Sequence, residues 1–141
     1  MIEKNEAISE QLSSSQTAHK AVAILLEKKA LDVRMYEVGD DNPITDFYVN
    51  ATGRSVSQVG SLADELIVKL EEFGRLDAKM EGKRGNTWIL VDYGDVIVNI
   101  FDREAREFYN LDRLMPPETE KDISDIVAEV DEKFKLNTVE E

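Results

Sequence analysis

The stretch Asn86–Phe101 reads NTWILVDYGDVIVNIF and contains two apolar segments on either side of Asp92–Asp95. This pattern predicts two β-strands folded back around a tight turn, because Asp and Gly favour reverse turns. A hairpin with one face in water has polar residues at every second position, and this one does not. The expected sides are Trp88, Leu90, Val96, Val98 and Ile100 on one, and Ile89, Val91, Tyr93, Ile97 and Phe101 on the other. Both faces are apolar, so we expect the protein's own helices to cover one face and a partner to cover part of the rest.

Hydrophobic spacing around the hairpin predicts helices and strands in alternation. The expected helices are about Ser15–Lys29, Ser55–Phe73 and Arg103–Tyr109, and the expected strands are Ala30–Val38, Asp46–Ala51 and Asp77–Gly82. Ser55 and Gln58 form the S-x-x-Q pattern of a capping box, so the second helix has the strongest signal. In the third helix, Ala105 and Phe108 are expected to pack inward. This order predicts the α/β (α+β) class, with one domain, a mixed β-sheet and flanking helices.

The two ends of the chain differ from the middle. Residues 1–14 are polar and unpatterned, residues 15–115 form the predicted domain, and residues 116–141 form an acidic extension. Apolar side chains in this extension recur at helical spacing, and they are Ile123, Ile126, Val127, Val130 and Phe134. Residues 118–141 carry nine acidic and three basic side chains. We therefore expect an amphipathic helix that docks on the protein's own body, away from any surface that faces RNA.

The composition of the 141 residues suits one globular domain, with 42% hydrophobic and 33% charged side chains. A formal net charge of −13 argues against binding that depends mainly on phosphate contacts. The sequence has no apolar run of the roughly 20 residues that span a membrane, no secretory signal at its N-terminus and no cysteine. These features predict a cytoplasmic protein without disulfides or a thiolate metal site.

Three features could carry chemistry, and each has a plainer explanation. The single histidine, His19, lacks the neighbours of a metal motif, so we expect a surface or core role. Thr52–Ser55 joins a strand to a helix N-terminus that can bind phosphate, but a tight turn with an N-cap is favoured. Asp92 and Asp95 are a candidate Mg²⁺ pair, but a reverse turn is favoured, because no further carboxylates are seen to converge on them. A nucleotide-binding or nucleotidyltransferase-like enzyme that uses these groups stays open as the alternative function.

Aromatic and basic side chains leave further alternatives open. Aromatic residues and Met are enriched at the centres of protein interfaces, but they are also common in cores. Four side chains could have either role: Met80, Trp88, Tyr93 and Tyr109. The apolar hairpin favours the interface for part of this set. The sequence has one basic cluster, which consists of Arg75, Lys79, Lys83 and Arg84. We expect these side chains to be solvated and to protect the edge of a strand from pairing with another chain. A third possible function is a dimerisation module with the apolar sheet face in a symmetric homodimer.

Four blocks of the sequence, taken in order, resemble the ribosomal silencing factor family, which is also called Iojap-like. The blocks are Ile44–Val49 with Ala51–Ser55, Met80–Gly82, Trp88–Val98 and Arg106–Leu111. Their order and spacing agree with the family from about Thr17 to Met115. One such block would be weak, whereas four in order are specific.

The resemblance implies a fold related to nucleotidyltransferases but without their catalytic carboxylates, and a role that is not enzymatic and uses no cofactor or metal. It implies binding to the large ribosomal subunit through its fourteenth L-series protein, which blocks joining of the small subunit and represses translation under nutrient limitation. We expect a monomer or weak homodimer that touches ribosomal RNA only peripherally, since the acidic charge fits a basic protein better than bare RNA. The predicted partner-binding residues are Met80, Trp88, Leu90, Asp92, Tyr93, Gly94, Asp95, Asn99 and Tyr109.

Two positions depart from the family pattern. Asn99 stands where the family commonly has histidine, so a hydrogen bond to the partner differs if that position touches it. Met115 stands where many members end in tryptophan. The helical extension that follows is expected to lie outside the shared pattern.

Overall fold

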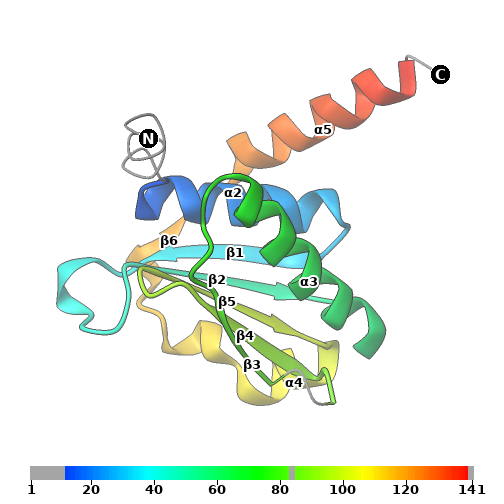
Figure 1. Cartoon of the computed structure of the whole chain (residues 1–141). Helices are drawn as coiled ribbons and strands as arrows, with labels where there is room; N and C mark the ends of the chain where they lie inside the picture. Colours follow the sequence, from blue (N-terminus) through cyan, green and yellow to red (C-terminus); the bar gives the residue numbers. More distant parts are fainter. Residues whose placement is uncertain (1–11, 83–84, 140–141) are drawn as a thin grey trace.

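The computed structural model describes residues 12–82 and 85–139, which form one mixed six-stranded sheet with helices on both faces (Figure 1). The strands are β1 (Leu31–Glu37), β2 (Phe47–Thr52), β3 (Lys79–Glu81), β4 (Trp88–Asp92), β5 (Val96–Phe101) and β6 (Glu120–Lys121). The helices are α2 (Ser14–Glu27), α3 (Val56–Glu72), α4 (Arg103–Tyr109) and α5 (Ser124–Val139), with short 3₁₀ turns η1 (Gly39–Asp41), η2 (Leu111–Leu114) and η3 (Pro117–Thr119). The sheet order is β3-β4-β5-β2-β1-β6, and only β2 and β5 pair in parallel within the described residues. The predicted class is confirmed.

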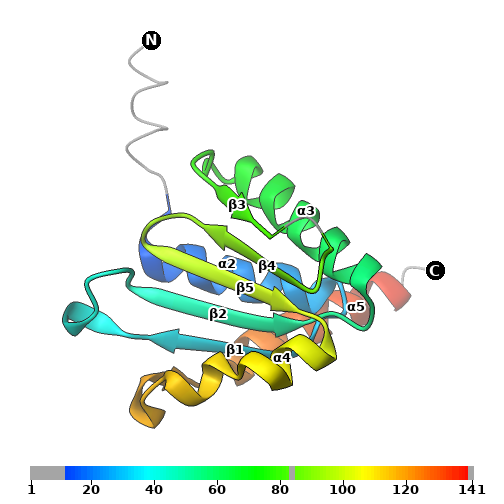
Figure 2. The ribbon, with the colours of Figure 1, turned by 90° about the horizontal axis from the view of Figure 1, so that it is seen from below.

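Helices α2 and α3 cover one face of the sheet, and α4 lies on the other face (Figure 2). Ser13 and Gln16 form a reciprocal capping box at the start of α2, and Ser55 caps α3 by accepting the Gln58 amide. The predicted box at Ser55 is half formed, because the Gln58 side chain accepts the Arg54 amide instead of the Ser55 amide. The core between the helices and the sheet includes the fully buried side chains Val22, Leu25, Leu66, Leu70, Ile89, Val91 and Val98.

Beyond the ends of β4 and β5 the Tyr93 amide donates to the Val96 carbonyl at 2.9 Å, which closes a two-residue loop of Gly94 and Asp95. Gly94 has a φ of 87°. The pairs across the hairpin are Trp88–Phe101, Leu90–Asn99 and Val91–Val98. The expected sides of β5 are therefore wrong: Ile97, Asn99 and Phe101 share a face with Trp88 and Leu90, whereas Val96, Val98 and Ile100 share the helix-covered face with Ile89 and Val91. A two-residue loop sets odd-numbered residues opposite even-numbered ones, and a shift of one position moves a whole strand to the other face.

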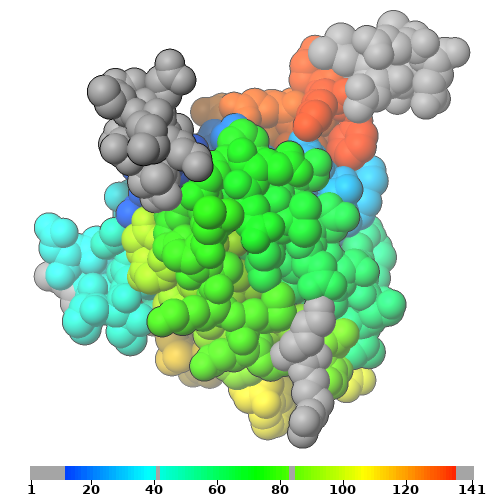
Figure 3. Space-filling model, in the orientation of Figure 1, coloured from blue at the N-terminus to red at the C-terminus, as the bar shows by residue number. Residues whose placement is uncertain are grey.

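The acidic extension belongs to the same folded unit as the residues before it. Its strand β6 pairs with β1 through Met35–Lys121 and Tyr36–Glu120, so the extension adds an edge strand to the sheet. Helix α5 packs on α2 with Ile126 and Val130 buried, which confirms the predicted docking. Figure 3 shows α5 (orange to red) along the top of the molecule and α4 (yellow) at the bottom. Of the polar segment 1–14, residues 1–11 lie outside the described residues, Ser13 caps α2 and Ser14 is its first residue.

Replacing Ile126 by Ala should lower the free energy of unfolding by about 2–4 kcal/mol, because a buried side chain is lost and a cavity remains. Ile126 is 3% exposed. Glu132→Ala, at an exposed position of the same helix, is the control and should change this free energy by less than about 0.5 kcal/mol. Chemical denaturation followed by circular dichroism measures both. Equal effects of the two substitutions would show that α5 does not dock on α2 in solution.

Candidate partner-binding site

The face of the sheet opposite α2 and α3 carries a row of aromatic rings. The Trp88 ring stacks on Phe101 with centroids 5.2 Å apart and lies 4.7 Å from Tyr109, which meets Phe108 edge to face at 5.0 Å. Phe108 is 80% exposed and Tyr109 48%, so the expectation that Phe108 packs inward is wrong. Leu90 extends the row along β4 and lines a hollow of about 200 Å³ with Trp88. We call Trp88, Leu90, Phe108 and Tyr109 the aromatic surface.

A ladder of buried amides lies beneath Trp88. The indole Nε1–H donates to Asn99 Oδ1 at 3.0 Å, Asn99 Nδ2 donates to Asn50 Oδ1 at 3.2 Å, and Asn50 Nδ2 donates to Asp112 Oδ1 at 3.0 Å. Asn99 is only 2% exposed, so it is placed under the surface and not on it, contrary to its predicted contact with a partner. Its role in this geometry is to hold the indole of Trp88 in one orientation.

The ladder ends in a charged group that fastens α4 and η2 to the sheet. Arg106 donates from Nε to Asp112 Oδ2 at 2.7 Å and from Nη1 to Thr52 Oγ1 at 2.8 Å, and the Tyr36 hydroxyl donates to Asp112 Oδ1 at 2.7 Å. Burial raises the pKa of Asp112, but the hydrogen bonds from Arg106, Asn50 and Tyr36 outweigh it and hold that pKa below its usual value.

Residue spacing along the sequence does not predict this ladder. Asn50 and Asn99 each stand among apolar residues in a strand, and they pair across the parallel strands β2 and β5. A polar amide inside a strand that is otherwise apolar was the available signal, because a buried amide needs a hydrogen-bond partner. The hydrogen-bond partner of each amide depends on the strand order, which local sequence patterns do not determine.

A second polar group ties the turn of the hairpin to the helices. Arg75, expected on a solvated edge, is 6% exposed and donates to both oxygens of Asp95, at 2.8 and 3.2 Å, and to the Tyr93 carbonyl at 3.0 Å. The same guanidinium also reaches Asp77 and the hydroxyl of Thr17 on α2. Burial raises the pKa of Asp95, but the hydrogen bonds from Arg75 and Ser14 outweigh it and lower that pKa. Asp95 is therefore engaged by an arginine, and its predicted place in a partner surface or Mg²⁺ site is not supported by this geometry.

The other groups of the alternative nucleotide site have structural roles. Asp92 Oδ1 accepts the Gly94 amide at 2.7 Å, which confirms the predicted reverse turn. A Cβ atom on Gly53 would lie 2.8 Å from Val59 Cγ2, so this glycine permits close packing of α3. His19 Nε2 lies 3.3 Å from Glu129 on α5. Within residues 12–82 and 85–139, no group of three or more His, Cys, Asp or Glu side chains is placed to hold a metal ion.

Two of the predicted partner-binding residues lie on the helix-covered side. Tyr93 is 4% exposed, its ring lies 5.2 Å from the Arg75 guanidinium, and burial raises its pKa to about 12. Met80 pairs with Val91 and packs against the core. Trp88, Leu90 and Tyr109 belong to the aromatic surface. Asp92 is half-buried and Gly94 is exposed. Of the basic cluster, Lys79 is exposed, and Lys83 and Arg84 lie outside the described residues.

Fold and site together define a single-domain α+β protein whose exposed candidate site is an aromatic surface. The chain belongs to the ribosomal silencing factor family, because residues 11–140 match the family model described as "Ribosomal silencing factor during starvation". This match includes the extension after residue 115, so the expectation that the extension lies outside the family pattern is wrong. In the described residues, no helix is long and apolar enough to cross a membrane.

Named relatives and a solved structure agree with this family. The Haemophilus influenzae ribosomal silencing factor is 40% identical over 86 residues, which are 61% of this chain and 84% of that protein. A Mus musculus protein named "Mitochondrial assembly of ribosomal large subunit protein 1" is 28% identical over 96 residues, covering 66% of this chain and 42% of that one. A crystal structure of a Chromobacterium violaceum protein superposes with a TM-score of 0.70 at 30% identity, covering 74% of this chain and 87% of that one.

Replacing Asn99 by Leu should lower the free energy of unfolding by about 1–3 kcal/mol, because the Trp88 N–H and the Asn50 amide lose a buried partner. Asn99→His restores a nitrogen that can accept the indole proton, so it should lose less. Because Trp88 is the only tryptophan of the chain, its emission spectrum reports the change directly. An emission spectrum of folded Asn99→Leu that equals that of the original protein would contradict the role of Asn99.

Stability should fall at low pH more steeply in the original protein than in Asp112→Asn. The folded state lowers the pKa of Asp112, so the carboxylate's contribution is present above the unfolded value of about 3.9 and is lost as the pH falls through the folded value. Urea denaturation between about pH 3 and pH 7 measures the two slopes. Asp131→Asn, at an exposed position of α5, is the control for removing one carboxylate. Parallel curves for Asp112→Asn and the original protein would contradict the prediction.

Proposed function

We propose that this protein binds the large ribosomal subunit through its fourteenth L-series protein and blocks joining of the small subunit by steric exclusion, which represses translation under nutrient limitation. The family supports a ribosomal role. The name of the mouse relative supports the large subunit. The observation that carries the proposal is the aromatic surface, because exposed and ordered aromatic rings are typical of the energetic centres of protein interfaces.

Charge supports a protein partner over bare RNA. The net charge is −13. The exposed Glu104 and Glu107 lie on α4, which carries Phe108 and Tyr109, and the exposed Glu81 lines the hollow beside Trp88 and Leu90. Such a surface repels the phosphates of RNA and attracts a basic protein. This attraction raises the rate of association with the basic partner. Any contact with ribosomal RNA is then peripheral.

In this proposal the protein acts in the cytoplasm as a monomer or weak homodimer and carries out no catalysis. The carboxylate and hydroxyl groups that an alternative nucleotide enzyme would use are engaged: Asp95 by Arg75, and Thr52 by Arg106. Helix α5 packs on α2. Since α2 covers the face opposite the aromatic surface, the acidic extension points away from the docking side.

Co-sedimentation with separated ribosomal subunits tests the proposal. The protein should pellet with the large subunit and not with the small one, and its addition should reduce the fraction of joined ribosomes in a sucrose gradient. Binding to the small subunit alone, or to neither subunit, would overturn the proposed function.

Replacing Tyr109 by Ala should weaken binding to the large subunit by about 2 kcal/mol, roughly thirtyfold in Kd, because it removes an exposed aromatic anchor next to Trp88. Phe73→Ala is the matched control, since Phe73 is 44% exposed at the end of α3, on the helix-covered side. Its Kd should stay within about twofold of the original value. Melting curves of both variants establish that they are folded. Equal Kd values for a folded Tyr109→Ala protein and the original protein would remove Tyr109 from the site.

A further inference from the structure

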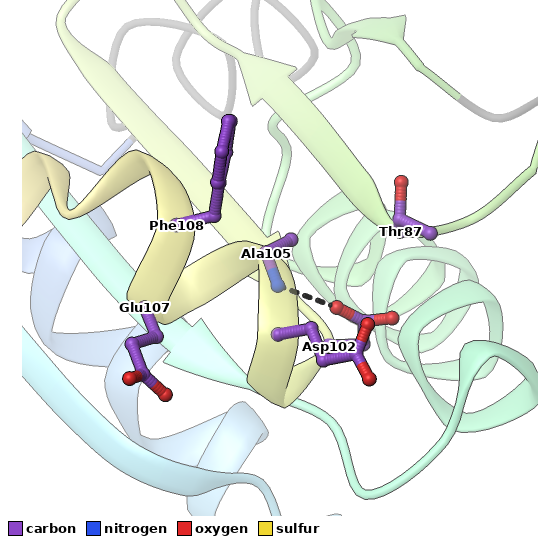
Figure 4. A pocket seen from close by; sticks show the side chains of 6 residues that line it. Thr87, Asp102, Ala105, Glu107 and Phe108 are labelled. Atoms are coloured by element: carbon purple, nitrogen blue, oxygen red, sulfur yellow. Dashed lines mark hydrogen bonds between the residues drawn. The ribbon is translucent and has the colours of Figure 1, made fainter.

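A hollow of about 500 Å³ lies between α4 and the residue before β4, next to the aromatic surface. It is lined by Thr87, Asp102, Glu104, Ala105, Glu107 and Phe108. Figure 4 shows Thr87 and Phe108 on opposite sides of it, with Ala105 and Asp102 between them. Because Phe108 contacts Tyr109, this hollow and the aromatic surface form one continuous area.

The ring of Phe108 forms one wall of the hollow, and no helix or strand among residues 12–82 and 85–139 covers this ring. It is 80% exposed, although its neighbour Ala105 on α4 is buried. The edge-to-face contact with Tyr109 at 5.0 Å restrains the ring while leaving most of its surface open. An exposed aromatic face carries a negative electrostatic potential, which attracts a cation placed over it.

Carboxylates line the same hollow as this ring. Glu104 precedes Phe108 by four residues on α4, a spacing that puts both side chains on one side of a helix. Neither Glu104 nor Glu107 forms an ion pair with another residue that the structure describes. Asp102, at the floor, accepts the Ala105 amide at 2.8 Å and holds the start of α4 in place.

We propose that this hollow receives an arginine side chain of a basic partner protein. The guanidinium would stack on the face of Phe108 and pair with the carboxylate of Glu104, while its apolar stem lies over Ala105. Arginine fits better than lysine, because its planar group stacks on rings and pairs with carboxylates at the same time. The inference rests on the proposed function, since it names the side chain by which a basic ribosomal protein extends its contact beyond the aromatic surface.

Binding to purified large subunits tests the pocket inside the complex. Glu104→Gln and Phe108→Leu should each raise the Kd about tenfold at low salt. The effect of Glu104→Gln should shrink at high salt, because exposed charge pairs are screened, and the effect of Phe108→Leu should persist. The matched controls, Glu132→Gln on α5 and Phe73→Leu at the end of α3, should leave the Kd unchanged.

A second measurement tests the pocket without a ribosome. Nuclear magnetic resonance titration with Nα-acetyl-arginine amide should shift the signals of Ala105 and Phe108, whereas the uncharged analogue Nα-acetyl-citrulline amide should not. The shifts should disappear in Glu104→Gln. If the protein fails to bind large subunits but these shifts appear, the proposed function fails and the arginine site stands.

Two results would overturn the arginine site. The first is the absence of shifts with the arginine compound, or equal shifts with citrulline. The second is a large-subunit Kd that changes in Phe108→Leu but not in Glu104→Gln at low salt, which would assign the hollow to an apolar side chain.

Discussion

The strand β5 is buried at all six of its positions, and the rest of the structure depends on this constraint. A strand without a solvated face needs cover on both sides, because its apolar side chains and its backbone groups are removed from water together. Helices α2 and α3 cover one side. The chain covers the other side at once, since Asp102 directly follows β5 and caps α4, which turns back over the face that carries Phe101.

Full burial of β5 removes the Asn99 amide from water, and a buried amide without hydrogen-bond partners destabilises the folded state. Asn99 avoids this by accepting a hydrogen bond from Trp88 on one neighbouring strand and donating one to Asn50 on the other. The same hydrogen bonds order the aromatic surface. A ring that is already fixed by Asn99, Phe101 and Tyr109 loses little freedom on binding, and this preorganisation favours affinity.

Two arginines secure the two ends of β5. Arg75 binds the turn that precedes the strand, through Asp95 and the Tyr93 carbonyl. Arg106 binds Thr52, which pairs with Phe101 at the end of the strand. Both guanidinium groups are nearly buried and paired with carboxylates, an arrangement that is costly to disturb on one side only. The charged side chains of the hairpin and of η2 thus serve the fold, and the aromatic rings with the exposed glutamates of α4 remain for a partner.

Local sequence patterns were enough to predict the class of the fold, the hairpin and most helix positions, because these follow from residue spacing, caps and turns such as Ser55 and Gly94. The family likeness also came from local blocks. The side of β5 that each residue takes depends on the tertiary structure, because the loop length sets the register and a strand with apolar residues on both faces does not reveal that length. The tertiary structure also decided that Tyr93 is core and Phe108 is surface, and that Arg75 and Asn99 are buried. Those outcomes depend on which strands and helices become neighbours, and contacts between residues far apart in the chain leave no periodic signal in the sequence.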